Sequence, residues 1–303
     1  MYTGRFAPSP SGLLHFGSLV AALASWLDAR AANGRWLVRI EDLDTPRSSP
    51  AVATAILRQL EAFGLEWDGP VVYQSARVDK YKAALETLQR SGNAYWCACT
   101  RREIADSTNR PGEASASRVY PGTCRSGLRP GATPRAMRVR THDHPVRFID
   151  RMAGSVEQIV AREVGDFVVL RADGVFAYQL AVVVDDAEQG VTDVVRGADL
   201  LDSTARQILL QQLLGIATPR YLHVPIAVSE SGAKLSKQNG AQPLPEEQRV
   251  QVLRDALGFL GLGDAPAADR GDVLAWARAR WKARLAAATT TRFAVSAPPR
   301  YYT

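Results

Sequence analysis

Residues 5–18 read RFAPSPSGLLHFGS, and this stretch predicts a short strand, a tight turn and a helix in immediate succession. Pro, Ser and Gly fill positions 8–12, where their backbone preferences favour a sharp turn. The apolar residues that follow, among them Leu19, Leu23 and Leu27, recur at helical spacing. A helix that begins directly after such a turn presents free backbone N–H groups to an anion. The stretch therefore predicts a phosphate-binding turn, although an ordinary turn before a helix has a similar composition.

A second stretch with phosphate-binding character lies far along the chain, at residues 229–240, which read SESGAKLSKQNG. Lys234 and Lys237 stand three residues apart in this Gly- and Ser-containing loop. Lysine side chains are flexible point charges, so such a loop can reach a polyphosphate and offset developing negative charge. A solvated surface loop would look the same, and the interpretation therefore depends on the first stretch.

Together the two stretches resemble the paired HIGH and KMSKS elements of class I aminoacyl-tRNA synthetases, in the form used by the glutamyl and glutaminyl branch. Gln238 departs from the final Ser of the second element. The resemblance implies a Rossmann-like α/β catalytic domain that uses ATP, with Mg²⁺. It implies catalytic roles for His15, Gly17, Lys234 and Lys237, and ATP binding by His15, Gly17, Ser18 and Lys237.

Composition adds broad constraints on the class of protein. The chain has 303 residues, 46% of them hydrophobic, which is enough for a large core and predicts more than one domain. The formal charge of +6 is compatible with a polyanionic partner but does not require one. We expect a cytoplasmic protein without a membrane segment, since neither a leader pattern nor a long apolar run is present. Three cysteines, an odd number, do not indicate a disulfide framework.

Acidic and basic residues follow an expected strand at residues 35–40, where the chain reads RIEDLDTPR from Arg39 to Arg47. Ligands bind at such strand ends in open α/β sheets, although a salt-bridged surface turn would also fit. The segment resembles the RIEDTD segment of glutamyl-type synthetases, in which the glutamate matching Glu41 contacts the amino acid. The glutamate-binding residues that this resemblance implies are Arg5, Phe6, Ala7, Pro8, Ser9, Glu41, Tyr178 and Arg196.

The remaining pattern predicts how the chain is divided. Helical spacing favours core helices at residues 52–63 and 78–88 and further helices near 246–262 and 272–287, while residues 181–184 have the composition of a buried parallel strand. Short alternating segments between residues 136 and 170 predict a strand-rich insertion, which in the resembled family faces the RNA acceptor end. We therefore expect a nucleotide-binding domain at 1–93 and 171–240, an insertion at 94–170, and a short helical C-terminal region at 241–303.

The three cysteines fall within the expected insertion. Cys97 and Cys99 have a spacing that can place two thiolates on one metal ion, and Cys124 could approach from across a loop. Three ligands are one short of a closed tetrahedral site, and free thiols are the alternative. The resemblance implies one structural zinc ion, because some members of the family hold zinc here with a tyrosine four residues before the last cysteine, which matches Tyr120.

The resemblance extends over residues 4–240, and the residues after Gln238 are too few for the anticodon-binding region of a full glutamyl-tRNA synthetase. We therefore expect no anticodon-binding domain, as in the truncated paralogues of that branch. This implies a monomeric ligase that activates L-glutamate with ATP and transfers it to the queuosine base of tRNA(Asp). Two alternatives remain open: a minimal glutamyl-tRNA synthetase that charges a tRNA 3′ end, and an inactive paralogue that only binds tRNA or a small ligand.

Overall fold

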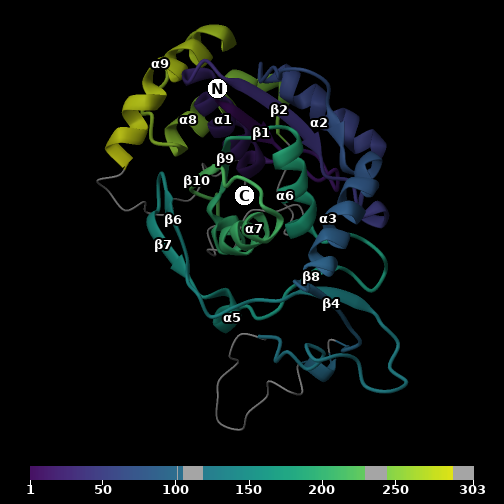
Figure 1. The fold of residues 1–303 in the computed structure, drawn as a ribbon. Helices are drawn as coiled ribbons and strands as arrows, with labels where there is room; N and C mark the ends of the chain where they lie inside the picture. Colours follow the sequence, from purple (N-terminus) through teal and green to yellow (C-terminus); the bar gives the residue numbers. More distant parts are fainter. Residues whose placement is uncertain (101, 105–118, 229–243, 289–303) are drawn as a thin grey trace.

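Parallel strands form the centre of the molecule, and helices pack on both of their faces (Figure 1). The computed structural model describes residues 1–100, 102–104, 119–228 and 244–288. The strands are β1 (Thr3–Phe6), β2 (Arg35–Ile40), β3 (Val72–Tyr73), β4 (Ala94–Cys97), β5 (Ala136–Val139), β6 (Val146–Asp150), β7 (Gly154–Gln158), β8 (Val168–Leu170), β9 (Asp193–Gly197) and β10 (Arg220–Val224). The α-helices are α1 (Phe16–Ala31), α2 (Pro50–Ala62), α3 (Val78–Arg90), α5 (Val160–Glu163), α6 (Tyr178–Glu188), α7 (Leu201–Leu214), α8 (Arg249–Phe259) and α9 (Arg270–Ala288). Short 3₁₀ turns are η1 (Thr45–Arg47), η2 (Gln74–Arg77), η3 (Ala198–Leu200) and η5 (Glu246–Gln248).

The order of the parallel strands confirms the expected Rossmann-like architecture. β1 pairs in parallel with β2, with Thr3 opposite Arg35, and β2 continues to β3. β9 pairs in parallel with β10. The two groups meet where the Thr192 N–H donates to the Thr3 carbonyl oxygen at 2.9 Å, which places β9 beside β1. The resulting order, β3-β2-β1-β9-β10, reverses direction at β1, and ligands bind at such a reversal in open α/β sheets.

Two hydrophobic cores lie on opposite faces of these strands. One core joins α1, α2, α8 and α9, and the other joins α3, α6 and α7. The helices expected at 52–63 and 78–88 are therefore confirmed as α2 and α3, and those expected in the C-terminal region as α8 and α9. Packing of α8 and α9 against α1 ties the C-terminal region to the helix that begins at the phosphate-binding turn.

One predicted element is wrong. Residues 181–184 were expected to form a strand, but they lie inside helix α6, which spans Tyr178–Glu188. The segment is apolar on every side because α6 is buried by neighbours all round, and a continuous apolar run does not distinguish a buried strand from a buried helix. As a consequence Tyr178 stands at the first turn of a helix, with its side chain beside the strand ends.

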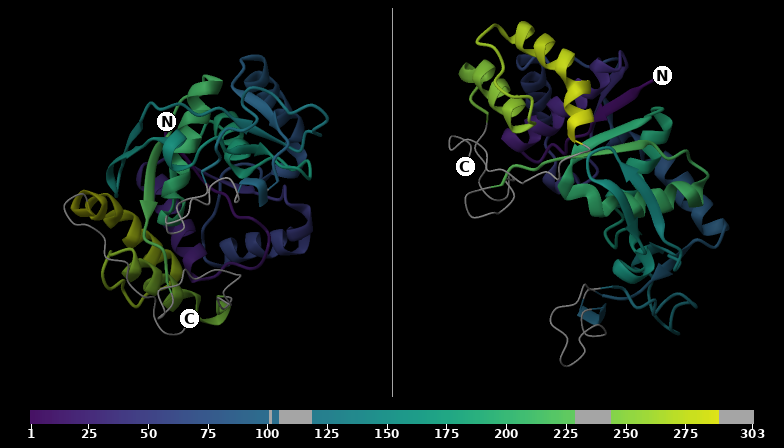
Figure 2. Two further views of the ribbon diagram at one scale, coloured as in Figure 1. Left: turned by 90° about the horizontal axis from the view of Figure 1, so that it is seen from below. Right: turned by 90° about the vertical axis from the view of Figure 1, so that its left-hand side faces the viewer.

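The strands expected between residues 136 and 170 are confirmed, and they belong to two different sheets. β4, β5 and β8 form an antiparallel sheet of their own. The β6–β7 hairpin instead adds to β10, where Asp150 lies opposite Tyr221. Figures 1 and 2 show the part of the chain around β4 projecting away from α8 and α9, at the far end of the molecule. Within the described residues no helix has the length and apolarity needed to cross a membrane.

Candidate active site

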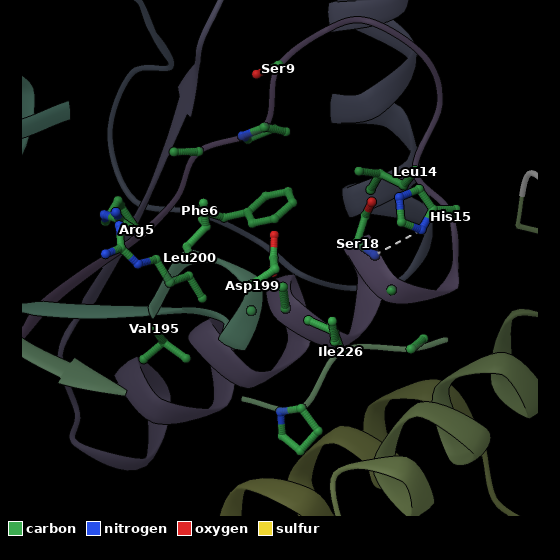
Figure 3. Close-up of a pocket in the computed structure, with 18 of the residues that line it drawn as sticks. Arg5, Phe6, Ser9, Leu14, His15, Ser18, Val195, Asp199, Leu200 and Ile226 are labelled. Atoms are coloured by element: carbon green, nitrogen blue, oxygen red, sulfur yellow. Dashed lines mark hydrogen bonds between the residues drawn. The ribbon is translucent and has the colours of Figure 1, made fainter. Parts of the chain in front are cut away.

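A pocket of about 470 Å³ lies where β1 and β9 end and α1 begins (Figure 3). Its position follows from the strand order, because the ends of β1 and β9 separate at the reversal. Glu41 is outside the pocket lining, and Lys234 and Lys237 fall outside the described residues. The sequence-predicted residues that line the pocket are Arg5, Phe6, Ala7, Pro8, Ser9, His15, Gly17, Ser18, Tyr178 and Arg196.

The end of the pocket near α1 has the properties of a phosphate site. His15 caps α1, and its Nδ1 accepts a hydrogen bond from the Ser18 backbone N–H at 3.4 Å (Figure 3). Because Nδ1 accepts, the ring proton lies on Nε2, which is then a donor for an anion. A Cβ at Gly17 would lie 3.2 Å from His15 Cε1, so glycine at this position leaves the imidazole in place. The turn, the histidine and the helix N-terminus together present donors to one region of the pocket.

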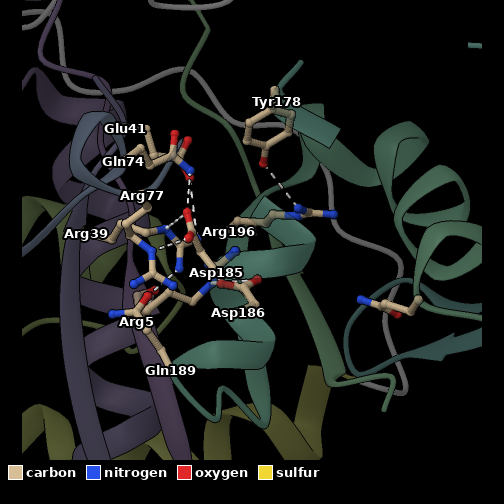
Figure 4. Close-up of polar contacts among 12 residues, drawn as sticks. Arg5, Arg39, Glu41, Gln74, Arg77, Tyr178, Asp185, Asp186, Gln189 and Arg196 are labelled. Atoms are coloured by element: carbon tan, nitrogen blue, oxygen red, sulfur yellow. Dashed lines mark hydrogen bonds and ion pairs between the residues drawn. The ribbon is translucent and has the colours of Figure 1, made fainter. Parts of the chain in front are cut away.

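Arg196, on β9, faces the pocket with a buried guanidinium group. Its Nε donates to His223 Nε2 at 3.0 Å, and its Nη2 donates to the Thr204 hydroxyl at 2.9 Å. Its Nη1 lies 3.4 Å from the Tyr178 hydroxyl (Figure 4). Each Nη nitrogen carries a second hydrogen, so the guanidinium keeps planar donors suited to a carboxylate.

Arg5 enters the pocket from a buried cluster of charged side chains (Figure 4). Its Nε donates to both oxygens of Asp186, at 3.1 and 3.3 Å. Arg39, whose side chain is fully buried, contacts Asp186 at 2.8 Å and Glu41 at 3.4 Å. Burial raises the pKa of Glu41 to about 7, although Arg39 and Arg5 both favour its ionised form. The structure therefore places Glu41 within the ion-pair cluster behind the pocket.

Sequence reasoning missed several side chains of the site. Asp199 and Ile226 line the pocket, and His223 with Asp150 lies directly behind Arg196. Asp199 and Ile226 follow the ends of β9 and β10, so the rule that ligands bind at strand ends could have found them. Asp150 carried no comparable signal, because its place depends on the pairing of β6 with β10.

The cysteines form a separate cluster beside β4. The Sγ atoms of Cys97, Cys99 and Cys124 lie within 4.8 Å of one another, and those of Cys99 and Cys124 are 3.6 Å apart. The Tyr120 hydroxyl oxygen lies 3.4 Å from Cys97 Sγ and 3.7 Å from Cys99 Sγ. Thiolates bound at 2.3 Å to a tetrahedral zinc ion stand about 3.8 Å apart. The three sulfurs and the phenol oxygen therefore fit the donor set of one zinc ion.

A buried arginine adds to the electrostatics of this cluster. Arg138 Nε lies 3.3 Å from Cys97 Sγ, and its guanidinium carbon is 3.9 Å from the centre of the Tyr120 ring. Burial raises the pKa of the Cys99 thiol to about 11, so that thiol is protonated at neutral pH unless a cation binds. Metal binding would release the proton, and Arg138 would offset part of the remaining negative charge.

Known proteins resemble this chain in sequence over most of its length. A family model described as tRNA synthetases class I (E and Q), catalytic domain, matches residues 2–256. Proteins named Glutamyl-Q tRNA(Asp) synthetase from Aromatoleum aromaticum and Thiobacillus denitrificans are each 57% identical over 92% of this chain, covering 89% and 92% of their own lengths. A relative with the same name from Burkholderia cenocepacia is 58% identical over 88% of this chain and 91% of its own length.

The fold is likewise similar to that of solved synthetases. A glutamate-tRNA synthetase from Elizabethkingia anophelis superposes with a TM-score of 0.74 at 26% identity, covering 90% of this chain, and this chain spans 65% of that protein's length. Enzymes of this class are ligases that use ATP. Because the family model covers most of the chain and relatives are more than half identical over nearly all of it, the chain belongs to the Glutamyl-Q tRNA(Asp) synthetase family within the class I tRNA synthetases (E and Q).

Proposed function

We propose that this protein activates L-glutamate with ATP and transfers the glutamyl group to the queuosine base of tRNA(Asp). The observation that carries the proposal is a single pocket with two chemically different ends (Figure 3). Arg5 stands at one end and His15 with Ser18 at the other, which suits an amino acid bound beside a phosphate chain. The names of the relatives support the choice of amino acid and RNA.

In the first step the α-carboxylate of glutamate attacks the α-phosphorus of ATP, and the bond to pyrophosphate breaks. The product is glutamyl-adenylate, and no proton is exchanged. His15 Nε2–H and the N–H groups at the start of α1 would stabilise charge on the phosphate oxygens, assisted by Lys234 and Lys237. Mg²⁺ bound with ATP would supply further positive charge. This step needs positioning and electrostatic stabilisation, so no nucleophilic side chain is required.

Selectivity for glutamate would come from the arginine end of the pocket. Arg196 and Tyr178 offer donors to a carboxylate, and Arg5 adds a second guanidinium. The backbone around Phe6, Ala7, Pro8 and Ser9 would hold the substrate along β1. Glu41 would act electrostatically from behind the pocket, favouring the substrate ammonium group when ionised. In the second step a hydroxyl of the queuosine cyclopentene ring attacks the glutamyl carbonyl, loses its proton, and AMP leaves.

The rest of the chain would serve structure and RNA binding. Residues 1–93 with 171–240 would form the nucleotide-binding domain, residues 94–170 an insertion, and residues 241–303 a short C-terminal region. Cys97, Cys99, Tyr120 and Cys124 would hold one structural zinc ion that fixes the chain around β4, apart from the reacting groups. We propose that the protein acts as a monomer in the cytoplasm.

The test is transfer of radiolabelled glutamate, with ATP, to total tRNA from cells that make queuosine and from cells that cannot. The proposal expects label only on queuosine-containing tRNA(Asp), and the label should survive removal of the 3′-terminal adenosine.

The outcome that contradicts the proposal is label on tRNA(Glu) from both kinds of cell, lost with the terminal adenosine. This would identify a minimal glutamyl-tRNA synthetase, a function that the likeness to solved glutamate-tRNA synthetases makes worth testing. If glutamate-dependent ATP–pyrophosphate exchange is absent with and without each tRNA, the protein would instead be an inactive paralogue that only binds its ligands.

A further inference from the structure

A chain of buried polar side chains extends behind Arg196 and away from the pocket. His223, on β10, accepts from Arg196 Nε at 3.0 Å. On its other side, His223 Nδ1 lies 2.7 Å from Asp150 Oδ2, at the end of β6. The side chains of His223 and Asp150 are both fully buried. Three strands therefore contribute one residue each to a continuous hydrogen-bonded line.

The protonation state of His223 follows from its partners. An arginine Nε–H can only donate, so His223 Nε2 must be the acceptor and the ring proton must lie on Nδ1. That proton is donated to the Asp150 carboxylate. Burial and the positive charge of Arg196 lower the pKa of His223, although the hydrogen bond to Asp150 works in the opposite direction. The imidazole is therefore neutral, with one defined tautomer.

The neutral state of His223 matters because an uncharged ring does not offset the positive charge of Arg196. Arg5 is held at Nε by Asp186, whose negative charge offsets much of its own positive charge. Arg196 is held at Nε by an uncharged ring and at Nη2 by the Thr204 hydroxyl. Arg196 thus has a fixed orientation and keeps its positive charge for a ligand carboxylate.

We propose that Asp150 and His223 are positioning residues that fix Arg196 for the carboxylate of glutamate. The inference rests on the proposed function, since it assigns Arg196 to glutamate binding. Asp150 sets the tautomer of His223, and His223 sets the orientation of the guanidinium. Because Asp150 belongs to the β6–β7 hairpin, the hairpin is part of the framework that shapes the glutamate end of the pocket.

Replacement of Asp150 by asparagine tests the tautomer directly. Asp150 Oδ1 accepts from the backbone N–H groups of Met152, Ala153 and His223, at 3.0, 2.8 and 3.3 Å. In Asp150→Asn the amide oxygen must occupy this position, which points the NH₂ group at His223 Nδ1. The ring proton is then forced onto Nε2, where it opposes the N–H of Arg196 at 3.0 Å and leaves only the Thr204 hydroxyl, 3.2 Å away, to accept it.

For Asp150→Asn we expect the KM for glutamate in ATP–pyrophosphate exchange to rise about 10- to 100-fold, as for loss of a hydrogen bond to a charged group. The KM for ATP should remain unchanged. Nitrogen NMR shifts of the His223 ring should report protonation at Nε2 in the variant and at Nδ1 in the original protein. His223→Gln keeps a neutral acceptor, so its KM for glutamate should rise less than that of His223→Leu.

A matched control is Asp166→Asn. Asp166 is also a buried carboxylate within residues 94–170, but it bonds Tyr95, Arg125 and Thr141, none of which lines the pocket. The Asp166→Asn variant should be less stable than the original protein, but its KM for glutamate should not change.

Arg196→Lys separates failure of this inference from failure of the proposed function. If Arg196→Lys raises the KM for glutamate and neither Asp150→Asn nor His223→Leu does, the positioning role is wrong. An equal rise in both KM values in Asp150→Asn would also overturn it, because it would indicate general disruption. If all three variants keep the original KM for glutamate, the proposed glutamate pocket itself is wrong.

Discussion

Arg5 is the residue at which the buried ion pairs meet the pocket, so its removal has two effects. Arg5→Ala deletes a donor in the pocket and, within the described residues, leaves Arg39 as the arginine paired with Asp186. The negative charge then left near the pocket should repel a carboxylate. We expect kcat/KM for glutamate in ATP–pyrophosphate exchange to fall by the equivalent of about 2–5 kcal/mol.

The control for this change is Arg77→Ala. Arg77 bonds Asp185 in the same cluster at 2.6 Å but does not line the pocket. It should reduce stability with little change in the KM for glutamate. Equal effects of the two variants on that KM would show that Arg5 acts only through the cluster.

Glu41 predicts an unusual dependence of stability on pH. Burial raises its pKa in the folded protein to about 7, from an ordinary value of 4.5. Between these values the folded state holds a proton that the unfolded state has released, so this contribution to stability is full at low pH and is lost as pH rises through 7. This pKa shift corresponds to a change of about 3 kcal/mol in the free energy of unfolding. Glutamine does not titrate, so Glu41→Gln removes this pH-dependent contribution.

Urea unfolding of the original protein and of Glu41→Gln at pH 5 and pH 8 measures this contribution. The stability of the variant relative to the original protein should increase from pH 5 to pH 8. Parallel changes in the two proteins would mean that Glu41 is ionised at both pH values in the folded state.

Single site residues were predictable from the sequence where they belong to a recognisable motif. His15 and Arg196 were assigned to one site across a long separation in sequence, and both line the pocket. Asp150 and His223 were not found, because a buried polar residue in a strand has no periodic or motif signal. The function of such a residue depends on which side chain the neighbouring strand places beside it.

Among the elements, α6 shows the limit of hydrophobic patterns most clearly. A run of five apolar residues followed by two aspartates is compatible with a strand that ends in a polar turn. In the structure Asp185 and Asp186 continue the same helix directly after this run, and both are buried and pair with arginines. The partners, Arg5, Arg39 and Arg77, come from β1, β2 and η2, so local sequence could not reveal them. α2 and α3 were predicted correctly because each has one apolar face and one polar face.

The docking of α9 on α1 gives a prediction for an element. Trp281 is fully buried, and its Nε1 donates to Asp28 at 2.9 Å. Trp281→Ala removes both the packing and this hydrogen bond, so we expect the free energy of unfolding to fall by about 3–5 kcal/mol. Trp276 on the same helix is only half-buried and stacks with Arg280. Trp276→Ala should cost only about 1 kcal/mol.

Urea unfolding followed by circular dichroism compares these two variants. A similar loss in both would contradict the prediction, because it would mean that burial of Trp281 and its hydrogen bond to Asp28 add nothing beyond the surface packing of Trp276. A loss in Trp281→Ala without reduced glutamate activation at low temperature would show that α9 supports the fold rather than the pocket.

In the whole molecule, segments far apart in the sequence add strands to the same central sheet. The sequence predicted that residues 94–170 form an insertion between the two halves of the nucleotide-binding domain. β6, which lies within this segment, nevertheless pairs with β10. Pairing between strands so far apart in sequence is decided by the packing of the complete fold, and short alternating strands do not specify their neighbours. The β4–β5–β8 sheet, in contrast, lies at the end of the molecule far from α8 and α9 (Figures 1 and 2), and none of the cysteines beside it lines the pocket.

This separation gives a prediction for metal removal. The cluster of Cys97, Cys99, Tyr120 and Cys124 shares no residue with the pocket lining, so zinc loss should loosen the chain around β4 without removing the groups proposed for glutamate activation. Metal analysis should find about one zinc ion per chain and less in Cys99→Ser. A zinc-selective chelator, with Mg²⁺ retained, should reduce transfer of glutamate to tRNA while ATP–pyrophosphate exchange persists, and added zinc should restore transfer. Loss of both activities together would show that the two parts of the molecule are coupled through the fold, and a chain without zinc would show that these side chains form a structural cluster of thiols around Tyr120.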